Sequence, residues 1–386
     1  MRIIINGRFL THRVTGVERY AREILRELDR VSGPAEFTLA VPPEVDDADM
    51  PHYANIRTVK VGRLHDRMWE HVSFPKYCAA NRAVSLNLCN VGPLPAPGIT
   101  AIHDVKPLVH PEYYTKRFAA WYRLLYANTV RRARCIITVS EFSKSEIVRY
   151  CKADPERIAV VPDAWQHILR TPYDREAPEK FGLEKGGYYF TLSSADPNKN
   201  FGWICGTARL MPEAVFAVAG NVNHTVFAAD ASADAGPDAL PENVRLLGYV
   251  TDAEAKTLMR DCKAFLFPSF YEGFGMPPLE AMGAGCSRVV VSDIPVMHEI
   301  FGEAAQYIDP EKPERLTEGT SDQAGSADAA AGTKADAAIR AFRGNAQVGE
   351  AIEREIAYTL GRIEGAYKLD ALKELVAGGG KAMSPF

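Results

Sequence analysis

The sequence predicts an α/β protein with two domains, each built on a parallel sheet that is covered by helices. Short β-branched runs alternate with helical patterns along most of the chain, which is typical of such sheets. A stretch rich in proline and glycine, residues 162–187, separates two series of this kind. The length of 386 residues also suits two hydrophobic cores better than one.

The expected strands form one group in each domain. In the first domain, residues 1–170, we expect strands at 2–6, 37–41, 99–102, 135–139 and 158–161. In the second domain, residues 183–365, we expect them at 188–192, 215–219, 244–247, 264–267 and 289–291. Residues 17–28 place their apolar side chains at helical spacing, which predicts an amphipathic helix after the first strand.

The C-terminal part of the chain changes character twice. Segment 317–338 is dominated by Ala, Gly, Ser, Asp and Thr, a composition that indicates a flexible or disordered segment. Helical periodicity returns over 348–376, and we expect the tail 378–386 to be disordered.

Composition excludes several classes of protein. Apolar content of 47% and charged content of 24% are ordinary for a globular protein, and the net charge of −4 gives no general attraction to nucleic acid. No apolar run approaches the roughly 20 residues of a membrane span. The N-terminus enters a strand without a secretory segment, so we expect a cytoplasmic protein whose seven scattered cysteines are reduced.

Residues 267–291 carry the most chemical information. Glu272 and Glu280 flank a Gly-Phe-Gly turn and a double proline, directly after an apolar strand. Pro277 or Pro278 suits the first turn of a helix, so we expect Glu272 in the loop above the strand and Glu280 in the first helical turn. The free N–H groups of such a turn favour a diphosphate, while a carboxylate accepts hydrogen bonds from sugar or ribose hydroxyls. The alternative is an ordinary strand–turn–helix with an acidic helix start.

Four further residues lie where strands or loops end. Lys199 follows the first strand of the second domain and either neutralises a diphosphate or is a solvated surface lysine. Gly16 either lets a phosphate approach the backbone or is only a helix-entry residue after Thr15. His103 ends a strand, where it either donates a hydrogen bond to a substrate hydroxyl or is structural, and Asp104 contacts the acceptor or orients the loop.

These segments resemble a known family. The stretch around Glu272 and Glu280, the Pro-Asn-Lys-Asn of 197–200 and the AIHDVKPLVHP around His103 resemble retaining glycosyltransferases of family 4, over about residues 1–310. The resemblance implies the GT-B fold, in which two Rossmann-like domains face each other across a cleft. It also implies that a helix at about 366–377 packs back on the first domain.

The resemblance assigns roles to individual residues. It implies catalytic roles for His103, Glu272 and Lys199, and acceptor contacts by Gly16 and Asp104. It implies that Glu280 binds the ribose and that backbone around Val250 meets the base. The implied donor-binding residues are Gly16, Ser194, Asn198, Lys199, Val250, Glu272, Gly273, Phe274, Gly275, Met276 and Glu280. Many family members have an arginine where this chain has Ser194 or Asn198.

The activity that the resemblance implies is transfer from a nucleotide-diphospho sugar with retention at the anomeric carbon, without a cofactor or metal. Residues 1–25 look like transferases of bacterial exopolysaccharide, capsule or O-antigen assembly. They favour mannose or rhamnose from a GDP donor, with a UDP or dTDP donor as the alternative. The family resemblance also implies a saccharide acceptor linked to polyprenyl diphosphate. Asp47 and Asp49 have the Asp-x-Asp spacing of metal-dependent transferases, but they lie in an acidic, proline-rich loop that we interpret as surface.

Two other functions stay open for a chain of this fold. One is a catalytically silent subunit that binds a nucleotide sugar, and the other is a nucleotide-sugar epimerase or phosphorylase-like enzyme. A dehydrogenase would need a Gly-x-Gly-x-x-Gly turn, which the sequence lacks. The basic, aromatic segment 116–134 is either an amphipathic helix with a solvated edge or a contact with the inner face of the cell membrane. The peptide Trp165-Gln166-His167 either lines the cleft or seals the inter-domain connection.

Overall fold

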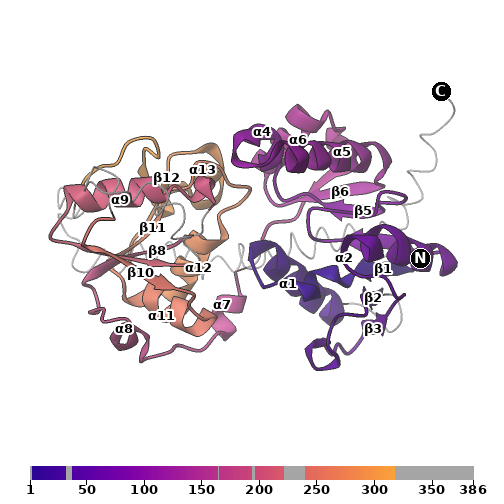
Figure 1. The fold of residues 1–386 in the computed structure, drawn as a ribbon, viewed down its shortest axis with the longest axis horizontal. Helices are drawn as coiled ribbons and strands as arrows, with labels where there is room; N and C mark the ends of the chain where they lie inside the picture. Colours follow the sequence, from indigo (N-terminus) through magenta and orange to yellow (C-terminus); the bar gives the residue numbers. More distant parts are fainter. Residues whose placement is uncertain (1, 32–36, 164, 194–195, 221–239, 318–386) are drawn as a thin grey trace. The chain divides into compact units, whose positions relative to one another are not determined.

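The computed structural model describes residues 2–31, 37–163, 165–193, 196–220 and 240–317. These residues divide into two compact units, the first before residue 164 and the second from Trp165 onward. The division falls shortly before the end of the first domain expected from the sequence. Each unit is a parallel sheet with helices on both faces, as predicted, and each is described separately below (Figure 1).

The first unit has a seven-stranded sheet in the order β3-β2-β1-β4-β5-β6-β7, with every pair parallel. Its strands are β1 (Ile3–Asn6), β2 (Phe37–Val41), β3 (Arg57–Lys60), β4 (Val84–Asn87), β5 (Ile99–Ala101), β6 (Cys135–Thr138) and β7 (Ile158–Val160). All five strands expected from the sequence are present within one or two residues. They are predictable because strands that are buried on both faces are continuous apolar runs.

Strands β3 and β4 are not among the predicted strands. β3 is an edge strand of partly exposed residues, so it has no apolar run. β4 lies in the middle of the sheet, yet it contains Ser85 and Asn87, both buried. Asn87 donates from Nδ2 to the carbonyl oxygen of Pro97 at 2.8 Å, and such hydrogen bonds make a buried amide tolerable.

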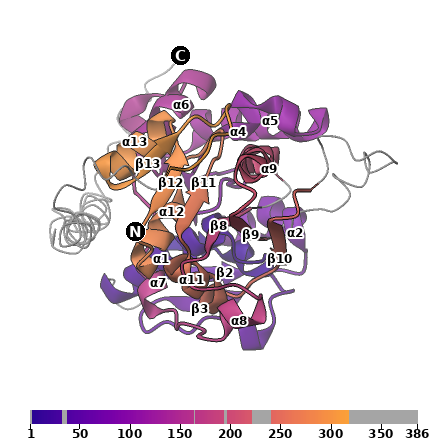
Figure 2. The ribbon, with the colours of Figure 1, turned by 90° about the vertical axis from the view of Figure 1, so that its left-hand side faces the viewer.

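Helices cover both faces of the first sheet. The predicted amphipathic helix is α1, and in Figures 1 and 2 it lies on the side opposite α5 and α6. Helix α5 makes up most of the segment 116–134 and begins after an N-cap hydrogen bond from the Phe118 N–H to Thr115 Oγ1. The helices of this unit are α1 (Gly16–Val31), α2 (Asp66–Met68), α3 (Phe74–Ala80), α4 (Lys106–Val109), α5 (Lys116–Arg132) and α6 (Glu141–Cys151).

The second unit has a six-stranded sheet in the order β10-β9-β8-β11-β12-β13, again parallel throughout. The strands are β8 (Tyr188–Leu192), β9 (Val215–Ala219), β10 (Val244–Gly248), β11 (Ala264–Phe267), β12 (Val289–Ser292) and β13 (Gln306–Ile308). The helices are α7 (His167–Arg170), α8 (Ala177–Lys180), α9 (Phe201–Leu210), α11 (Asp252–Asp261), α12 (Met276–Ala284) and α13 (Pro295–Phe301). Helix α9 lies on one face of the sheet, and α11 and α12 lie on the other (Figures 1 and 2).

The chain order changes direction between β8 and β11, which are neighbours in this sheet. In open α/β sheets a ligand binds beyond the carboxyl ends of the strands at such a switch point. The loops after β8 and β11 are those that hold Lys199 and Glu272.

The connection between the series of strands is more ordered than the sequence indicates. It contains the short helices α7 and α8, and it is bound to the second unit by hydrogen bonds. Tyr173 donates from its hydroxyl to the Ala284 carbonyl oxygen at 3.1 Å, and Lys256 donates from Nζ to the Thr171 carbonyl oxygen at 2.7 Å. These bonds attach the connection to α11 and α12.

Several remaining expectations can be compared with the described residues. All seven cysteines are free, as expected of reduced thiols, and Asp47 and Asp49 are exposed on the surface. No helix in the described ranges is long and apolar enough to cross a membrane. Ser194, the expected C-terminal helix, the tail and all but Thr317 of segment 317–338 lie outside the described residues.

Candidate functional site

In the second unit, the loops that follow β8 and β11 meet through an ion pair. Lys199 ends a 3-10 turn after β8, and its Nζ donates to Glu272 Oε1 at 2.7 Å. The same ammonium lies 4.7 Å from the centre of the Phe267 ring, at the end of β11. The structure therefore brings together two of the three residues that the sequence predicts to be catalytic.

Asn198 holds these two loops in place from inside the domain. Its side chain is only 1% exposed, and its Nδ2 donates to the Tyr271 carbonyl oxygen at 2.6 Å. The backbone N–H of Phe270 in turn donates to the Asn198 carbonyl oxygen at 3.0 Å. The Nδ2 group of Asn198 is thus used within the protein, and the donor contact of Asn198 stays a prediction.

The Gly-Phe-Gly loop leads into α12 through a residue that must be glycine. Gly275 is the N-cap with a φ of 99°, and a Cβ there would lie 3.0 Å from Met297 Cε. Gly273, Phe274, Gly275 and Met276 are all buried. The two glycines have no side chain, so any contact that they make with a ligand comes from the backbone.

Both prolines lie in the first turn of α12, where the sequence predicts one of them. Met276 is its first residue, so Pro277 and Pro278 take the second and third positions and remove two of the N–H groups that a helix start usually offers. The expected anion site at this helix end is therefore weak.

Glu280 is the fifth residue of α12, one step beyond the first turn in which it was expected. Its Oε1 lies 2.7 Å from His167 Nε2, and the two side chains are only 12% and 7% exposed. Sequence reasoning left the position of His167 open, since nothing in the peptide around it indicates a contact 113 residues away. The structure places it against the carboxylate that the resemblance assigns to ribose.

The loop before α11 has the expected helix start. Thr251 and Glu254 form a capping box, in which the Thr251 N–H donates to Glu254 Oε2 at 2.6 Å. Val250 directly precedes this cap and is partly buried. The cap fixes the backbone on which the predicted base contact depends.

In the first unit, the hydrogen that His103 was expected to donate to a substrate is already used. Its Nε2 lies 2.8 Å from the Leu88 carbonyl oxygen, and its ring packs edge-on against Tyr20 at 4.7 Å between ring centres. Burial lowers the pKa of His103, so the imidazole is neutral near pH 7. A neutral ring that donates from Nε2 can only accept at Nδ1, which corrects the expected donor role to that of an acceptor.

Asp104 orients the loop after His103, which is the second of its two predicted roles. Its Oδ1 accepts a hydrogen bond from the Lys106 N–H at 2.8 Å, at the start of α4. The direct acceptor contact of Asp104 stays a prediction. Gly16 is the exposed first residue of α1, and a Cβ there would meet nothing within 4 Å.

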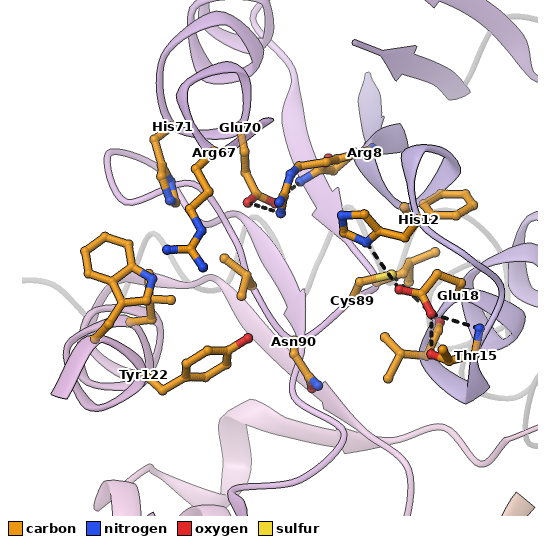
Figure 3. A pocket seen from close by; sticks show the side chains of 17 residues that line it. Arg8, His12, Thr15, Glu18, Arg67, Glu70, His71, Cys89, Asn90 and Tyr122 are labelled. Carbon is orange, nitrogen blue, oxygen red and sulfur yellow. Dashed lines mark hydrogen bonds and ion pairs between the residues drawn. The ribbon is translucent and has the colours of Figure 1, made fainter. Parts of the chain in front are cut away.

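A cavity of about 340 Å³ lies beside Gly16, at the carboxyl ends of β1 and β4 (Figure 3). An ion pair and a hydrogen bond line it: Arg8 Nη1 lies 3.0 Å from Glu70 Oε2, and His12 Nδ1 lies 3.3 Å from Glu18 Oε1. The lining also includes Thr15, Val17, Arg67, His71, Cys89, Asn90, Trp121 and Tyr122. Sequence reasoning missed this cavity, although it noted the aromatic residues of segment 116–134.

Comparisons with known proteins agree with this architecture. Residues 14–164 match the family model described as Glycosyltransferase Family 4, and residues 175–322 match Glycosyl transferases group 1. The O-antigen chain mannosyltransferase RfbU of Salmonella typhimurium is 27% identical over 212 residues, which are 54% of this chain and 56% of that protein. The O-antigen chain mannosyltransferase B of Escherichia coli is 30% identical over 221 residues, which are 55% of this chain and 57% of that protein.

The matched region thus spans a little more than half the length of these two relatives. Among solved structures, Anabaena Alr3699/HepE superposes with a TM-score of 0.64 at 15% identity, over 93% of this chain and 99% of that one. Sucrose-phosphate synthase from Thermosynechococcus elongatus superposes with a TM-score of 0.58 at 14% identity, over 98% and 97% of the two chains. With a glycosyltransferase model matched in each of its two parallel-sheet units, the chain belongs to the family 4 glycosyltransferases of GT-B fold.

Proposed function

We propose that this chain transfers a hexose or deoxyhexose from a nucleotide-diphospho sugar to a saccharide acceptor, with retention, in the synthesis of a bacterial surface polysaccharide. The observation that carries the proposal is the Lys199–Glu272 pair at the carboxyl ends of β8 and β11. The O-antigen mannosyltransferases among its relatives favour mannose. Rhamnose is the other candidate, and a GDP sugar is the proposed donor. The lipid-linked acceptor is part of the same proposal.

The donor would be held by groups of the second unit. Lys199 would neutralise the diphosphate, Glu272 would accept hydrogen bonds from sugar hydroxyls, and Glu280 would accept them from ribose. The buried Gly-Phe-Gly backbone would fix the sugar. Each of these groups is pinned by neighbours before the donor arrives, which keeps the cost of ordering the site low.

The reaction would exchange one bond at the anomeric carbon for another. The bond to the diphosphate oxygen breaks, and the acceptor oxygen attacks from the face that the leaving group vacates. The departing diphosphate takes the proton of the acceptor hydroxyl, and Lys199 stabilises its growing charge. No metal is needed in this scheme, so we expect full activity in EDTA.

The acceptor would bind in the cavity of the first unit. Its lining includes the carboxylates of Glu18 and Glu70 and the rings of Trp121 and Tyr122, a combination that suits a sugar, which offers hydroxyls and an apolar ring face. Arg67 is exposed, has no ion-pair partner in the described part of the chain, and would hold a phosphate of the acceptor. Figure 3 shows Arg67 and Tyr122 on the side of the cavity opposite Glu18.

The outer face of α5 would hold the protein at the inner membrane surface. Arg123, Leu124 and Arg131 are exposed at helical spacing, with Lys116 and Arg117 at the start of the helix. A cationic face with one exposed leucine fits anionic lipid headgroups. Sedimentation with phosphatidylglycerol vesicles tests this: Arg123→Glu with Arg131→Glu should lower binding, and equal binding of the variant would refute it.

The central experiment measures transfer. The protein is incubated with GDP-mannose, UDP-glucose or dTDP-rhamnose, each with polyprenyl-diphosphate-linked saccharide, and in EDTA. We expect one donor to release nucleoside diphosphate and yield a product whose anomeric configuration, read by nuclear magnetic resonance, matches the donor. Lys199→Met should abolish the product.

Other outcomes select the alternatives. Donor binding without any product would support a silent binding subunit, and an epimerised donor without transfer would support an epimerase. A product of inverted configuration would refute the retaining mechanism.

A further inference from the structure

We propose that His167 positions Glu280 for recognition of the ribose, which makes the inter-domain connection a part of the nucleotide site. This inference rests on the function proposed above. His167 Nε2 and Glu280 Oε1 are 2.7 Å apart, and both side chains are almost fully buried. At this distance the imidazole donates a hydrogen bond to the carboxylate.

The state of the imidazole follows from its other nitrogen. His167 Nδ1 is buried and has no hydrogen-bond partner in the described part of the chain. A hydrogen on Nδ1 would be a buried donor without an acceptor, which is energetically costly. An unprotonated Nδ1 without a donor costs less free energy. The hydrogen therefore belongs on Nε2, where it holds one oxygen of Glu280 in a fixed direction. A carboxylate has about four acceptor positions, so this bond leaves room for ribose hydroxyls.

The packing of α12 makes this contact possible. Gly283 lies three residues after Glu280, so the two share a face of the helix. A Cβ at Gly283 would lie 2.6 Å from Trp165 Cε3 and 2.7 Å from Ile168 Cγ2. The missing side chain lets the peptide 165–168 lie directly against α12. That close approach brings His167 within hydrogen-bond distance of Glu280.

The other end of α7 is fixed to α11. The Thr171 N–H donates to the His167 carbonyl oxygen at 3.1 Å, and Lys256 Nζ donates to the Thr171 carbonyl oxygen at 2.7 Å. The backbone of α7 is thus fixed at the end away from Glu280, while the imidazole contacts Glu280 at the start of the helix. Its orientation does not depend on the first unit, because all of these contacts lie within the second.

The test compares ribose with deoxyribose, because a purely structural role would not change that ratio. Affinities of GDP, 2′-deoxy-GDP and 3′-deoxy-GDP are measured by calorimetry, with the UDP series in parallel. For wild type we expect one deoxy analogue to bind about tenfold more weakly, as for a lost hydrogen bond to a charged group. In His167→Phe, which keeps a ring without a donor, the ratio should fall below about threefold.

Further variants separate positioning from folding. His167→Gln carries an amide donor at similar reach and should restore the ratio, while the shorter His167→Asn should not. Gly283→Ala, which displaces the connecting peptide, should lower the ratio as His167→Phe does. His298→Gln is the matched control, because His298 Nε2 pairs with Asp293 Oδ1 at 2.6 Å on an exposed surface of the same unit. It should leave the ratio unchanged.

An unchanged ratio in folded His167→Phe and His167→Asn, with GDP or UDP still bound, would overturn the inference and leave the proposed function intact. If wild type binds neither nucleotide series, the proposed function fails and the inference fails with it.

Discussion

Replacing Glu272 by glutamine should make a nucleoside diphosphate bind more tightly while sugar transfer falls. The Glu272 carboxylate is paired with the Lys199 ammonium at 2.7 Å, so a diphosphate must compete with Glu272 for that cation. The Lys199 and Glu272 side chains are 24% and 16% exposed, which places the pair between a surface and a buried ion pair. We take about 1 kcal/mol for its net strength, which is about fivefold in affinity.

The assay is calorimetric titration with GDP and with GDP-mannose. Glu272→Gln should bind GDP about fivefold more tightly than wild type. It should lose transfer, because a neutral amide accepts weaker hydrogen bonds from sugar hydroxyls. Glu272→Asp keeps the charge and should not gain GDP affinity. The reasoning fails if Glu272→Gln binds GDP no more tightly than wild type while Lys199→Met loses binding.

Three further changes test other parts of the structure. Gly16→Ala and its matched control Gly202→Ala should leave the free energy of unfolding equal or raise it by about 0.4–1 kcal/mol in thermal unfolding, because a Cβ at either site meets nothing within 4 Å. Only Gly16→Ala should lower turnover. Equal turnover of the two variants would show that no phosphate approaches Gly16. Gly283→Ala should lower the free energy of unfolding by about 1–3 kcal/mol in urea, since its Cβ would overlap the indole of the connecting peptide. The Arg260 guanidinium holds the pKa of Asp261 below its ordinary value, so Asp261 stabilises the fold above pH about 4 and loses this contribution as the pH falls further. Asp261→Asn should therefore be less stable than wild type at pH 7 and nearly equal near pH 2, and an equal deficit at both values would contradict this assignment.

The parts of the fold that the sequence predicts are those in which pattern and burial agree. Strand β11 is an unbroken apolar run and is buried along its whole length, so the run of apolar residues is enough to predict the strand. Strand β4 is equally buried but carries Ser85 and Asn87, and its stability depends on side-chain hydrogen bonds that only the folded chain supplies. A pattern of apolar residues cannot reveal a strand of this kind.

The contacts of the candidate site also differ in whether the sequence predicts them. The approach of Lys199 to Glu272 follows from sequence, because parallel strands bring their carboxyl ends to one edge of the sheet. The contact between His167 and Glu280 does not, since it depends on how closely a connecting peptide packs against Gly283. The anion site at α12 was overestimated because Pro277 and Pro278 leave two positions of the first turn without an N–H group.

An ion pair lies in each of the two candidate sites. Lys199 pairs with Glu272, and in the first unit Arg8 pairs with Glu70. A hydroxyl-rich ligand would therefore exchange hydrogen bonds with existing pairs and gain little net energy from any one of them. Specificity in such a site comes from geometry, because a sugar with one hydroxyl misplaced leaves a half-buried charge without its replacement partner. Removing one member of a pair also releases the other, so single substitutions measure both effects together, and double-mutant cycles are needed to separate them.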